Sequence, residues 1–200
     1  MKNRIDIKLI LLGNTFVGKT SLTLRFLNNV FNEFQEPTLG AAFFVKKFNH
    51  NNQLYKFEVW DTAGSEKYKS LLPIYYRNSK VALIVYDITN LKSFEDAKNW
   101  IRELKEILPD CFIILIGNKS DLIEKKKVDI DNSKTFAKKN NINFIETSAK
   151  TGYNVDKIFK IIIKNIKIKI KTKKSEYNKD NIIKINNTNL NNINNLNYCC

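Results

Sequence analysis

The sequence predicts an α/β fold, with a six-stranded, mostly parallel sheet, helices on both faces and one antiparallel hairpin at the sheet edge. Apolar runs alternate with helical patterns along most of the chain, as they do in parallel sheets that are covered on both faces. One pair of apolar runs is separated only by the turn-forming residues 49–52. This gap is too short for a crossover helix, so these two strands should form the hairpin.

Each element is predicted from its own pattern. The expected strands are the apolar runs 5–12, 42–48, 54–60, 81–86, 112–116 and 144–145. The expected helices are 19–27, 93–108, 133–139 and a last one from 155 to about 171. The last helix has apolar residues at helical spacing, although its Ile-Lys alternation from Ile166 would also suit a strand. A ligand is expected beyond the carboxyl ends of the parallel strands.

The composition fits one domain followed by a tail. Of the 200 residues, 43% are hydrophobic, enough for a single sizeable core. We expect this domain to span residues 1–172 and a disordered, Asn-rich tether to span residues 173–200. Three cysteines imply no disulfide framework, so a reducing compartment is expected. Neither a leader peptide nor a membrane-spanning run is expected from the apolar pattern.

The charge is strongly basic and unevenly spread. The formal net charge is +14, and residues 151–200 carry ten lysines against three acidic residues. Such a basic segment can form a solvated helix face, attract anionic lipid or bind nucleic acid. Nucleic acid is the least favoured of these three, and we expect no nucleic-acid partner.

A glycine-bearing loop, Gly-Asn-Thr-Phe-Val-Gly-Lys-Thr, lies between the first strand and the first helix. Its backbone N–H groups and the helix N-terminus can surround phosphates, Lys19 can reach the β and γ phosphates, and Thr20 can hold Mg²⁺. The alternative is an ordinary turn between strand and helix. The nucleotide-binding residues predicted here are Gly13, Asn14, Thr15, Phe16, Val17, Gly18, Lys19, Thr20 and Ser21.

Two further segments carry candidate phosphate and metal contacts. In Trp-Asp-Thr-Ala-Gly, Asp61 would hold Mg²⁺ indirectly or through water, and the Gly64 amide could approach the γ-phosphate. In the polar segment 31–40, Thr38 could bind Mg²⁺ through its hydroxyl and the γ-phosphate through its amide, and Phe31 could lie edge-on against the base. A plain Asp turn and a plain connector are the alternatives.

A base-binding site is predicted after the fifth and sixth strands. Asp121 in Asn-Lys-Ser-Asp can accept two hydrogen bonds from guanine N1–H and the exocyclic amine, which adenine cannot offer. Asn118 would address the opposite edge of the ring, and the Lys119 stem would cover its face. In Thr-Ser-Ala-Lys after the last strand, backbone amides can reach the base oxygen, and each of the two motifs alone could be a surface turn. The predicted base-binding residues are Asn118, Lys119, Asp121, Leu122, Ser148, Ala149 and Lys150.

In this order and spacing, the motifs resemble those of the Ras superfamily of small GTPases, which are P-loop NTPases. Trp60 before Asp-Thr-Ala-Gly, the run Tyr75-Tyr76-Arg77 and the terminal cysteine pair are similar to the Rab branch. Residues 34–43 resemble the early-endosomal Rab group. The resemblance implies a GTP/GDP switch that uses Mg²⁺, hydrolyses GTP and recruits effectors for vesicle trafficking.

The resemblance also implies roles for particular residues. Catalysis would involve Lys19, Thr38, Gly64 and Ser65; metal binding Thr20, Thr38 and Asp61; effector binding Phe43, Trp60 and Tyr75; and lipidation Cys199 and Cys200. Residues 66–76 would be the second switch segment. The expected partners are an exchange factor, a dual-finger GTPase-activating protein, a GDI or escort protein, and effectors. A monomer is expected on the cytoplasmic face of endosomal membranes, anchored by geranylgeranyl groups and cycling with the cytosol.

The chain departs from the family pattern at two positions near the phosphates. Ser65 stands where the family usually has the Gln that orients the attacking water, and its hydroxyl is too short for this task, so slow hydrolysis is expected. A hydrolysis-deficient, mainly GTP-bound scaffold is therefore the alternative function. Phe16 stands in the phosphate loop where small residues are usual, so its ring should point outward and nucleotide release should be faster.

Overall fold

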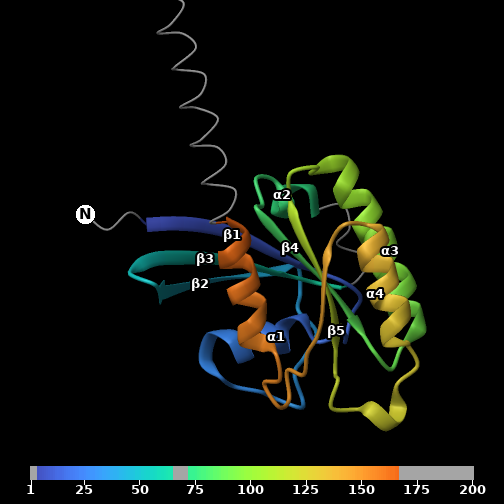
Figure 1. Ribbon diagram of the computed structural model, residues 1–200. Helices are drawn as coiled ribbons and strands as arrows, with labels where there is room; N and C mark the ends of the chain where they lie inside the picture. Colours follow the sequence, from blue (N-terminus) through green and yellow to red (C-terminus); the bar gives the residue numbers. More distant parts are fainter. Residues whose placement is uncertain (1–3, 65–71, 167–200) are drawn as a thin grey trace, which may run out of the picture. The chain divides into compact units, whose positions relative to one another are not determined.

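The computed structural model describes residues 4–64 and 72–166 of the chain (Figure 1). Residues 1–159 belong to one unit and residues 160–200 to a second, of which the described residues 160–166 are helical. In the first unit the strands form one six-stranded sheet in the order β2-β3-β1-β4-β5-β6. The strands are β1 (Arg4–Leu12), β2 (Ala41–His50), β3 (Gln53–Thr62), β4 (Val81–Asp87), β5 (Phe112–Asn118) and β6 (Asn143–Glu146).

The pairing confirms the predicted sheet. All neighbouring strands are parallel except β2 and β3, which form the predicted edge hairpin, with Ala41 opposite Thr62 and His50 opposite Gln53. The hairpin turn is shorter than the predicted gap 49–52, because the ladder continues through His50. Only Asn51 and Asn52 make the turn, with φ values of 50° and 61°. Two positive φ angles are typical of the tight turn whose twist matches that of antiparallel strands.

The helices in the described ranges are α1 (Lys19–Asn28), α2 (Leu72–Tyr76), α3 (Leu91–Ile107), the 3₁₀ turn η2 (Ile123–Lys125), α4 (Ile130–Lys139) and the helical residues 155–166. Two helices begin earlier than predicted. The side chain of Asn90 accepts a hydrogen bond from Ser93 N at the start of α3, and that of Asp129 accepts one from Asp131 N at the start of α4. These polar residues are N-caps, so each helix begins directly after its cap.

The core of the first unit lies on both faces of the central strands. Every residue of β4 is buried, and its alternate residues Ala82, Ile84 and Tyr86 belong to a cluster with α3. On the other face, Leu22 and Phe26 of α1 line a small apolar space together with residues of the central strands. Side chains cover both faces of β4, so a ligand cannot bind there. In open α/β sheets the ligand binds beyond the carboxyl ends of the strands, where polar groups are accessible.

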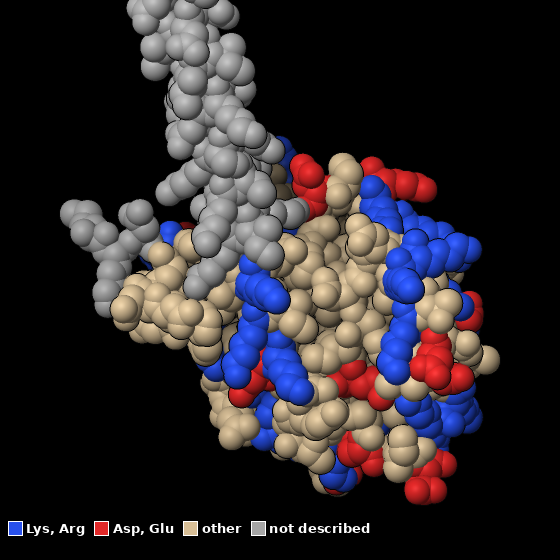
Figure 2. All heavy atoms as spheres, viewed as in Figure 1, with Lys and Arg blue, Asp and Glu red and all other residues tan. Residues whose placement is uncertain are grey.

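Charged side chains gather on the side of α3 and α4 (Figure 2). Several of the lysines there form ion pairs one helical turn away, such as Lys98 with Glu95 at 2.7 Å and Lys134 with Asp131 at 3.1 Å. This pairing is typical of a solvated helix face. In the described part of the chain, no helix is long and apolar enough to cross a membrane.

Candidate nucleotide-binding site

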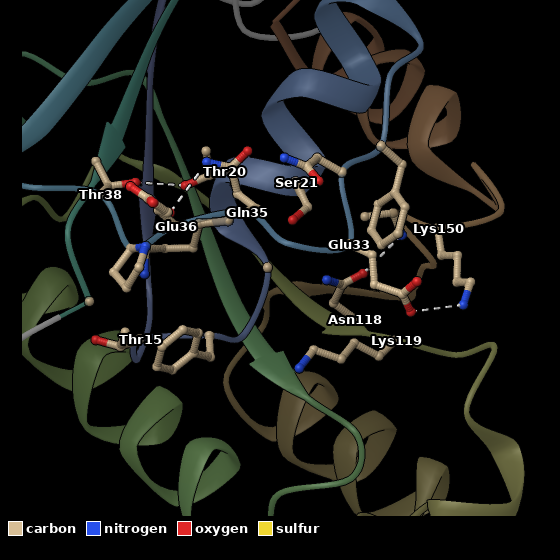
Figure 3. A pocket seen from close by; sticks show the side chains of 18 of the residues that line it. Thr15, Thr20, Ser21, Glu33, Gln35, Glu36, Thr38, Asn118, Lys119 and Lys150 are labelled. Atoms are coloured by element: carbon tan, nitrogen blue, oxygen red, sulfur yellow. Dashed lines mark hydrogen bonds and ion pairs between the residues drawn. The ribbon is translucent and has the colours of Figure 1, made fainter.

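A cavity of about 290 Å³ opens at the carboxyl ends of the strands (Figure 3). Fifteen of the predicted nucleotide-binding residues line it: Thr15, Phe16, Gly18, Lys19, Thr20, Ser21, Phe31, Thr38, Gly64, Asn118, Lys119, Asp121, Leu122, Ala149 and Lys150. The other four predicted residues do not line the cavity: Gly13, Asn14, Val17 and Ser148. Six further lining residues lie in the predicted segments 31–40 and 60–64 but were not named as individual contacts: Asn32, Glu33, Gln35, Glu36, Pro37 and Thr62. The structure therefore brings segments that are far apart in sequence to one site.

The phosphate loop has the shape that an anion site requires. Gly18, the N-cap residue of α1, has a φ of 94° and makes no side-chain cap, so the first N–H groups of the helix are left for a ligand. A Cβ at Gly18 would lie 2.3 Å from Nδ2 of Asn118, which explains why glycine is needed there. The first helical turn thus presents its backbone donors at the cavity.

Lys19 is held across this loop. Its Nζ donates hydrogen bonds to Gly13 O at 2.8 Å and to Asn14 O at 2.9 Å. Burial lowers the pKa of Lys19 to about 8, while the nearby Asp61 carboxylate partly opposes the shift. A phosphate beside Nζ would favour the charged ammonium and raise this pKa again.

Three oxygen-bearing side chains meet beside Lys19. The hydroxyls of Thr20 and Thr38 are 2.7 Å apart, and Thr38 Oγ1 donates to Asp61 Oδ2 at 3.4 Å. The second carboxylate oxygen, Asp61 Oδ1, is buried without a hydrogen-bond partner. Burial raises the pKa of Asp61, whereas hydrogen bonds from Thr20 and Thr38 and the charge of Lys19 act in the opposite direction.

These donors fit Mg²⁺. Hydroxyl and carboxylate oxygens are hard ligands, and Mg²⁺ is usually bound by few protein groups together with water and phosphate. The unpartnered Asp61 oxygen is the kind of buried acceptor that such a hydrated cation satisfies. Within residues 4–64 and 72–166, no group of three or more His, Cys, Asp or Glu side chains is placed to hold a metal.

Gly64 contacts the phosphate loop directly. A Cβ at this position would lie 2.2 Å from both Asn14 C and Thr15 N. These are backbone atoms that cannot move aside like a side chain, so the close approach requires glycine. The predicted contact of the Gly64 amide with a γ-phosphate is compatible with this position.

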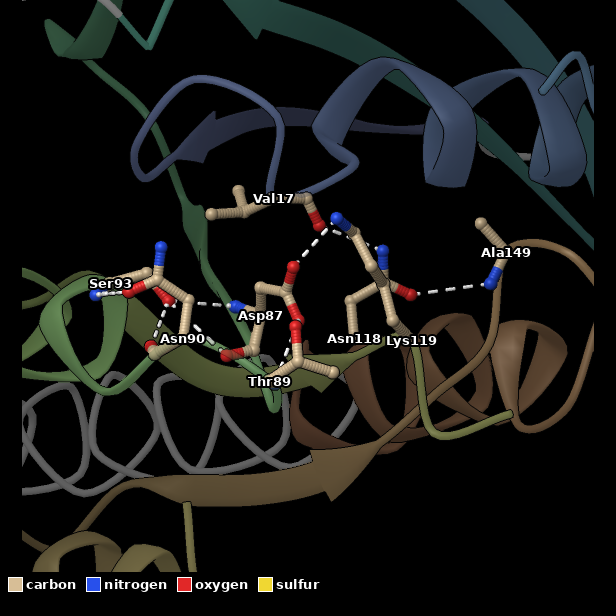
Figure 4. Close-up of polar contacts among 8 residues, drawn as sticks. All are labelled: Val17, Asp87, Thr89, Asn90, Ser93, Asn118, Lys119 and Ala149. Carbon is tan, nitrogen blue, oxygen red and sulfur yellow. Dashed lines mark hydrogen bonds and ion pairs between the residues drawn. The ribbon is translucent and has the colours of Figure 1, made fainter. Parts of the chain in front are cut away.

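Asn118, the last residue of β5, connects two loops at the site (Figure 4). Its Nδ2 donates to Val17 O at 2.9 Å, and its Oδ1 accepts from Ala149 N at 3.2 Å and from Thr147 Oγ1 at 3.3 Å. The side chain is almost fully buried. Asn118 therefore holds the phosphate loop and the loop after β6 together, and its predicted contact with the base edge stays a prediction.

Asp87 is a site residue that the sequence analysis missed. Its Oδ2 forms an ion pair with Lys119 Nζ at 2.6 Å, and its Oδ1 accepts from Thr89 N at 2.8 Å and Thr89 Oγ1 at 2.7 Å. Asp87 ends β4 directly opposite Asn118 of β5. The sequence did contain a signal for Asp87, because a charged residue at the end of an otherwise apolar strand indicates a site residue. The carboxylate fixes the Lys119 stem that is predicted to cover the base (Figure 4).

The predicted guanine reader, Asp121, is also oriented by a neighbour. Ser148 is fully buried, and its hydroxyl donates to Asp121 Oδ1 at 2.6 Å. Elsewhere in the lining of the cavity, Lys150 Nζ lies 3.4 Å from Glu33 Oε1. Both side chains of this second pair are largely exposed, so it contributes little stability. It does connect the loop after β6 with the segment that carries Phe31 and Thr38 (Figure 3).

The three aromatic residues predicted to bind effectors form one group. The rings of Phe43 and Trp60 have centroids 5.0 Å apart, and those of Trp60 and Tyr75 are 5.7 Å apart. Phe43 is 51% exposed, whereas Trp60 and Tyr75 are half-buried against the core. Together they make a continuous aromatic surface of the kind that partner proteins bind, and their role remains a prediction.

Phe16 has an unusual backbone conformation. Its φ is 65°, in the left-handed region, and its ring is 70% exposed. An outward ring was expected. A left-handed conformation costs a non-glycine residue roughly 1–2 kcal/mol, so this loop holds a strained residue beside the phosphate site.

We predict that Phe16→Gly slows GDP release about fivefold relative to Phe16→Ala. Both variants lack the ring, but only glycine adopts a positive φ without cost, and a gain of about 1 kcal/mol in the bound loop corresponds to this factor. Release of a fluorescent GDP analogue, followed by stopped flow, measures the effect. Equal rates for the two variants would show that the strain does not control release.

Some predicted residues lie outside the described ranges. These are Ser65, residues 66–71 of the second switch segment, the lipidation sites Cys199 and Cys200, and the tether 173–200. Of the second switch segment, α2 is described from Leu72 to Tyr76.

The fold and this site define a P-loop nucleotide-binding protein: a glycine-bearing loop lies between the central strand β1 and α1, next to the side-chain oxygens of Thr20, Thr38 and Asp61. The Ras family model matches residues 8–168 of the chain. The chain therefore belongs to the Ras family of GTPases, whose members bind guanine nucleotides.

Curated relatives give the branch of the family. The chain is 51% identical to the Ras-related protein RABF2b of Arabidopsis thaliana over 156 residues, which are 78% of each chain. It is 49% identical to the Ras-related protein Rab5A of Oryza sativa subsp. japonica over 160 residues, 80% of this chain and 79% of that one. It is 48% identical to the Ras-related protein Rab5 of Nicotiana tabacum over 165 residues, 82% of each. The prediction of a Rab is confirmed, and these relatives are of the Rab5 type.

Proposed function

We propose that this Rab is a GTP/GDP switch that binds Mg²⁺-GTP, hydrolyses it slowly and recruits effectors for vesicle trafficking at early endosomes. One observation carries the proposal: a single cavity is lined by the phosphate loop, by Thr20 and Thr38, and by Asp121, and the Asp61 carboxylate accepts a hydrogen bond from the Thr38 hydroxyl. The similarity to Rab5-type proteins supports the endosomal assignment.

In this proposal the residues at the phosphate end bind and orient the nucleotide. Lys19 and the N-terminal amides of α1 would bind the β and γ phosphates, and the Gly64 amide would approach the γ-phosphate. Thr20 and Thr38 would hold Mg²⁺ directly. Asp61 would hold the cation indirectly, through a water molecule bound to Mg²⁺. When bound, Mg²⁺ neutralises charge that develops on the phosphate oxygens.

The base end would supply the preference for guanine. Asp121 would accept hydrogen bonds from guanine N1–H and the exocyclic amine while Ser148 donates to its Oδ1. Lys119, fixed by Asp87, would cover one face of the ring. A base without these two donors would leave a carboxylate unpaired in the site, which is costly.

We predict that Ser65→Gln raises the rate of intrinsic GTP hydrolysis by at least about tenfold, because a Gln at this position can orient the attacking water. The native rate should be on the order of 10⁻⁴ s⁻¹ or lower. Single-turnover assays on Mg²⁺-loaded protein measure both rates. Ser65→Ala is the matched control and should hydrolyse GTP as slowly as the native protein. Equal rates for the native protein and Ser65→Gln would contradict the role given to this position.

A second candidate function is a mainly GTP-bound membrane scaffold, and Ser65 is the observation that favours it. A dual-finger Rab GTPase-activating protein distinguishes the two functions, because proteins of that type bring both Arg and Gln to the phosphate in trans. If it restores turnover, the protein is a switch whose hydrolysis depends on its partner. If hydrolysis stays absent, the scaffold function is supported instead.

We propose that the first 172 residues form the GTPase domain and residues 173–200 a tether that ends in a lipid anchor. Two geranylgeranyl chains, on Cys199 and Cys200, would give stable anchoring where one chain does not. The protein would then cycle between endosomal membrane and cytosol as a monomer with an exchange factor and a GDI or escort protein. Mass spectrometry of the protein from cells tests the anchor, and finding no prenylated form would refute it.

A further inference from the structure

Arg25 of α1 makes four hydrogen bonds through all of its guanidinium nitrogens. Nε donates to Ala149 O at 2.8 Å and Nη2 donates to Lys150 O at 2.6 Å. Nη1 donates to Asn29 O at 2.8 Å and to Asn29 Oδ1 at 3.0 Å. The planar fork therefore binds two consecutive carbonyls of the loop after β6, and Asn29 holds the guanidinium itself in place.

The carbonyl of Lys150 leads from Arg25 to the base site. In a trans peptide, a C=O and the following N–H point in opposite directions. Because Arg25 binds Lys150 O on one side, the N–H of Thr151 points to the other side, where it donates to Ser148 Oγ at 3.0 Å. The Ser148 hydroxyl in turn donates to Asp121 Oδ1 at 2.6 Å. A continuous series of hydrogen bonds therefore runs from Arg25 to Asp121.

The direction of each bond in this series is fixed. A hydroxyl has one hydrogen and two lone pairs. Ser148 Oγ receives the Thr151 N–H and gives its only hydrogen to Asp121, so it orients this carboxylate and occupies one of its lone pairs. Donors in such a series also polarise each other. Asp121 is exposed and lines the cavity, and the partly buried hydrogen bond from Ser148 restrains its carboxylate.

We propose that Arg25 is a positioning residue for base recognition. It holds the loop 148–151 so that Ser148 turns the Asp121 carboxylate toward the two hydrogen-bond donors of guanine. Because Arg25 lies on α1, whose first turn carries Lys19 and Thr20, one rigid helix sets both the phosphate end and the base end of the site. This inference rests on the proposed guanine-nucleotide function.

The experiment compares two nucleotides on the full-length chain. GDP and inosine diphosphate differ only by the exocyclic amine, which donates to the Asp121 carboxylate in the proposed function. A hydrogen bond to a charged group corresponds to a preference for GDP of roughly 10- to 100-fold. Dissociation constants of both Mg²⁺-nucleotides are measured by fluorescence competition, together with the melting temperature of each GDP-loaded variant.

Four variants are compared with the native protein. Arg25→Gln and Ser148→Ala break the series at its start and at its last step, and both should reduce the preference for GDP at least about fivefold. Arg25→Lys keeps one charged donor and should give an intermediate preference, because a point charge cannot bind both carbonyls. Arg102→Gln is the matched control on α3, where the Arg102 side chain donates a hydrogen bond to Asn99 Oδ1. Its preference should be unchanged.

If Arg25 only stabilises the fold, the experiment should give a different result. Arg25→Gln would then lower the melting temperature and weaken both nucleotides by the same factor, and an unchanged preference would overturn the inference. If Arg25→Gln does not fold, Ser148→Ala decides, and a native preference in that variant overturns the inference as well. A native protein with no preference for GDP would refute the proposed function itself, before any variant is measured.

Discussion

Asp121→Asn should lower the affinity for GDP by about 10⁴-fold and create affinity for xanthosine diphosphate. A site built to pair with donors of its ligand rejects a mismatched partner by about this factor. The Ser148 hydroxyl gives its only hydrogen to Oδ1 of residue 121, so the Asn oxygen should take that position. The Asn amide group then faces the base, where it opposes guanine N1–H and donates to the additional xanthine carbonyl.

Nucleotide competition at equilibrium measures this change, and Asp129→Asn is the matched control. Asp129 caps α4 by accepting from Asp131 N, and Asn caps a helix equally well. The control should therefore keep both the native stability and the native preference for GDP. If Asp121→Asn still binds GDP as tightly as the native protein, Asp121 does not read the base.

Thr20→Val should release GDP about 100-fold faster than the native protein in the presence of Mg²⁺. The two side chains have nearly the same shape, but valine lacks the hydroxyl that is proposed to bind the cation. Loss of even an indirect partner of a bound metal typically lowers the affinity for the metal by about 10- to 100-fold, and Thr20 is proposed to bind Mg²⁺ directly. Thr20 is half-buried beside Thr38, so the substitution should change metal binding more than folding.

The decisive measurement is GDP release with Mg²⁺ and again after chelation. Release from the native protein should accelerate strongly on chelation, whereas Thr20→Val should release quickly under both conditions. Thr135→Val on the exposed face of α4 is the control and should respond to chelation like the native protein. A full response to chelation in Thr20→Val would show that Thr20 is not a metal ligand.

The fold was predicted from the sequence because its signals are local. Buried parallel strands such as β4 are continuous apolar runs, and the short gap between β2 and β3 permits only a hairpin. Helix starts were less accurate, because Asn90 and Asp129 are polar residues that cap helices and do not belong to the apolar pattern. The five-residue helix α2 and the turn η2 were not predicted, since elements of this length show no periodicity.

The site was predicted in part for the same reason. The phosphate loop, Asp121 and Ser148 belong to short motifs at strand ends, where residue type and spacing are informative. Arg25 lies 124 residues before the carbonyl of Ala149 that it binds, and no local pattern connects two such positions. Asn118 shows a further limit, because no local pattern predicts the hydrogen bonds by which its buried amide connects the phosphate loop with the loop after β6.

The contact between Gly64 and the phosphate loop restricts how this protein can vary. Any larger residue at position 64 would collide with backbone atoms of Asn14 and Thr15, so no compensating change of a neighbouring side chain can restore the fit. Natural variants and laboratory libraries should therefore be depleted of every alternative at this position. The number of tolerated substitutions should therefore be lowest at position 64, where the backbone packs against another backbone segment. It should be higher at neighbouring positions whose contacts are made by side chains.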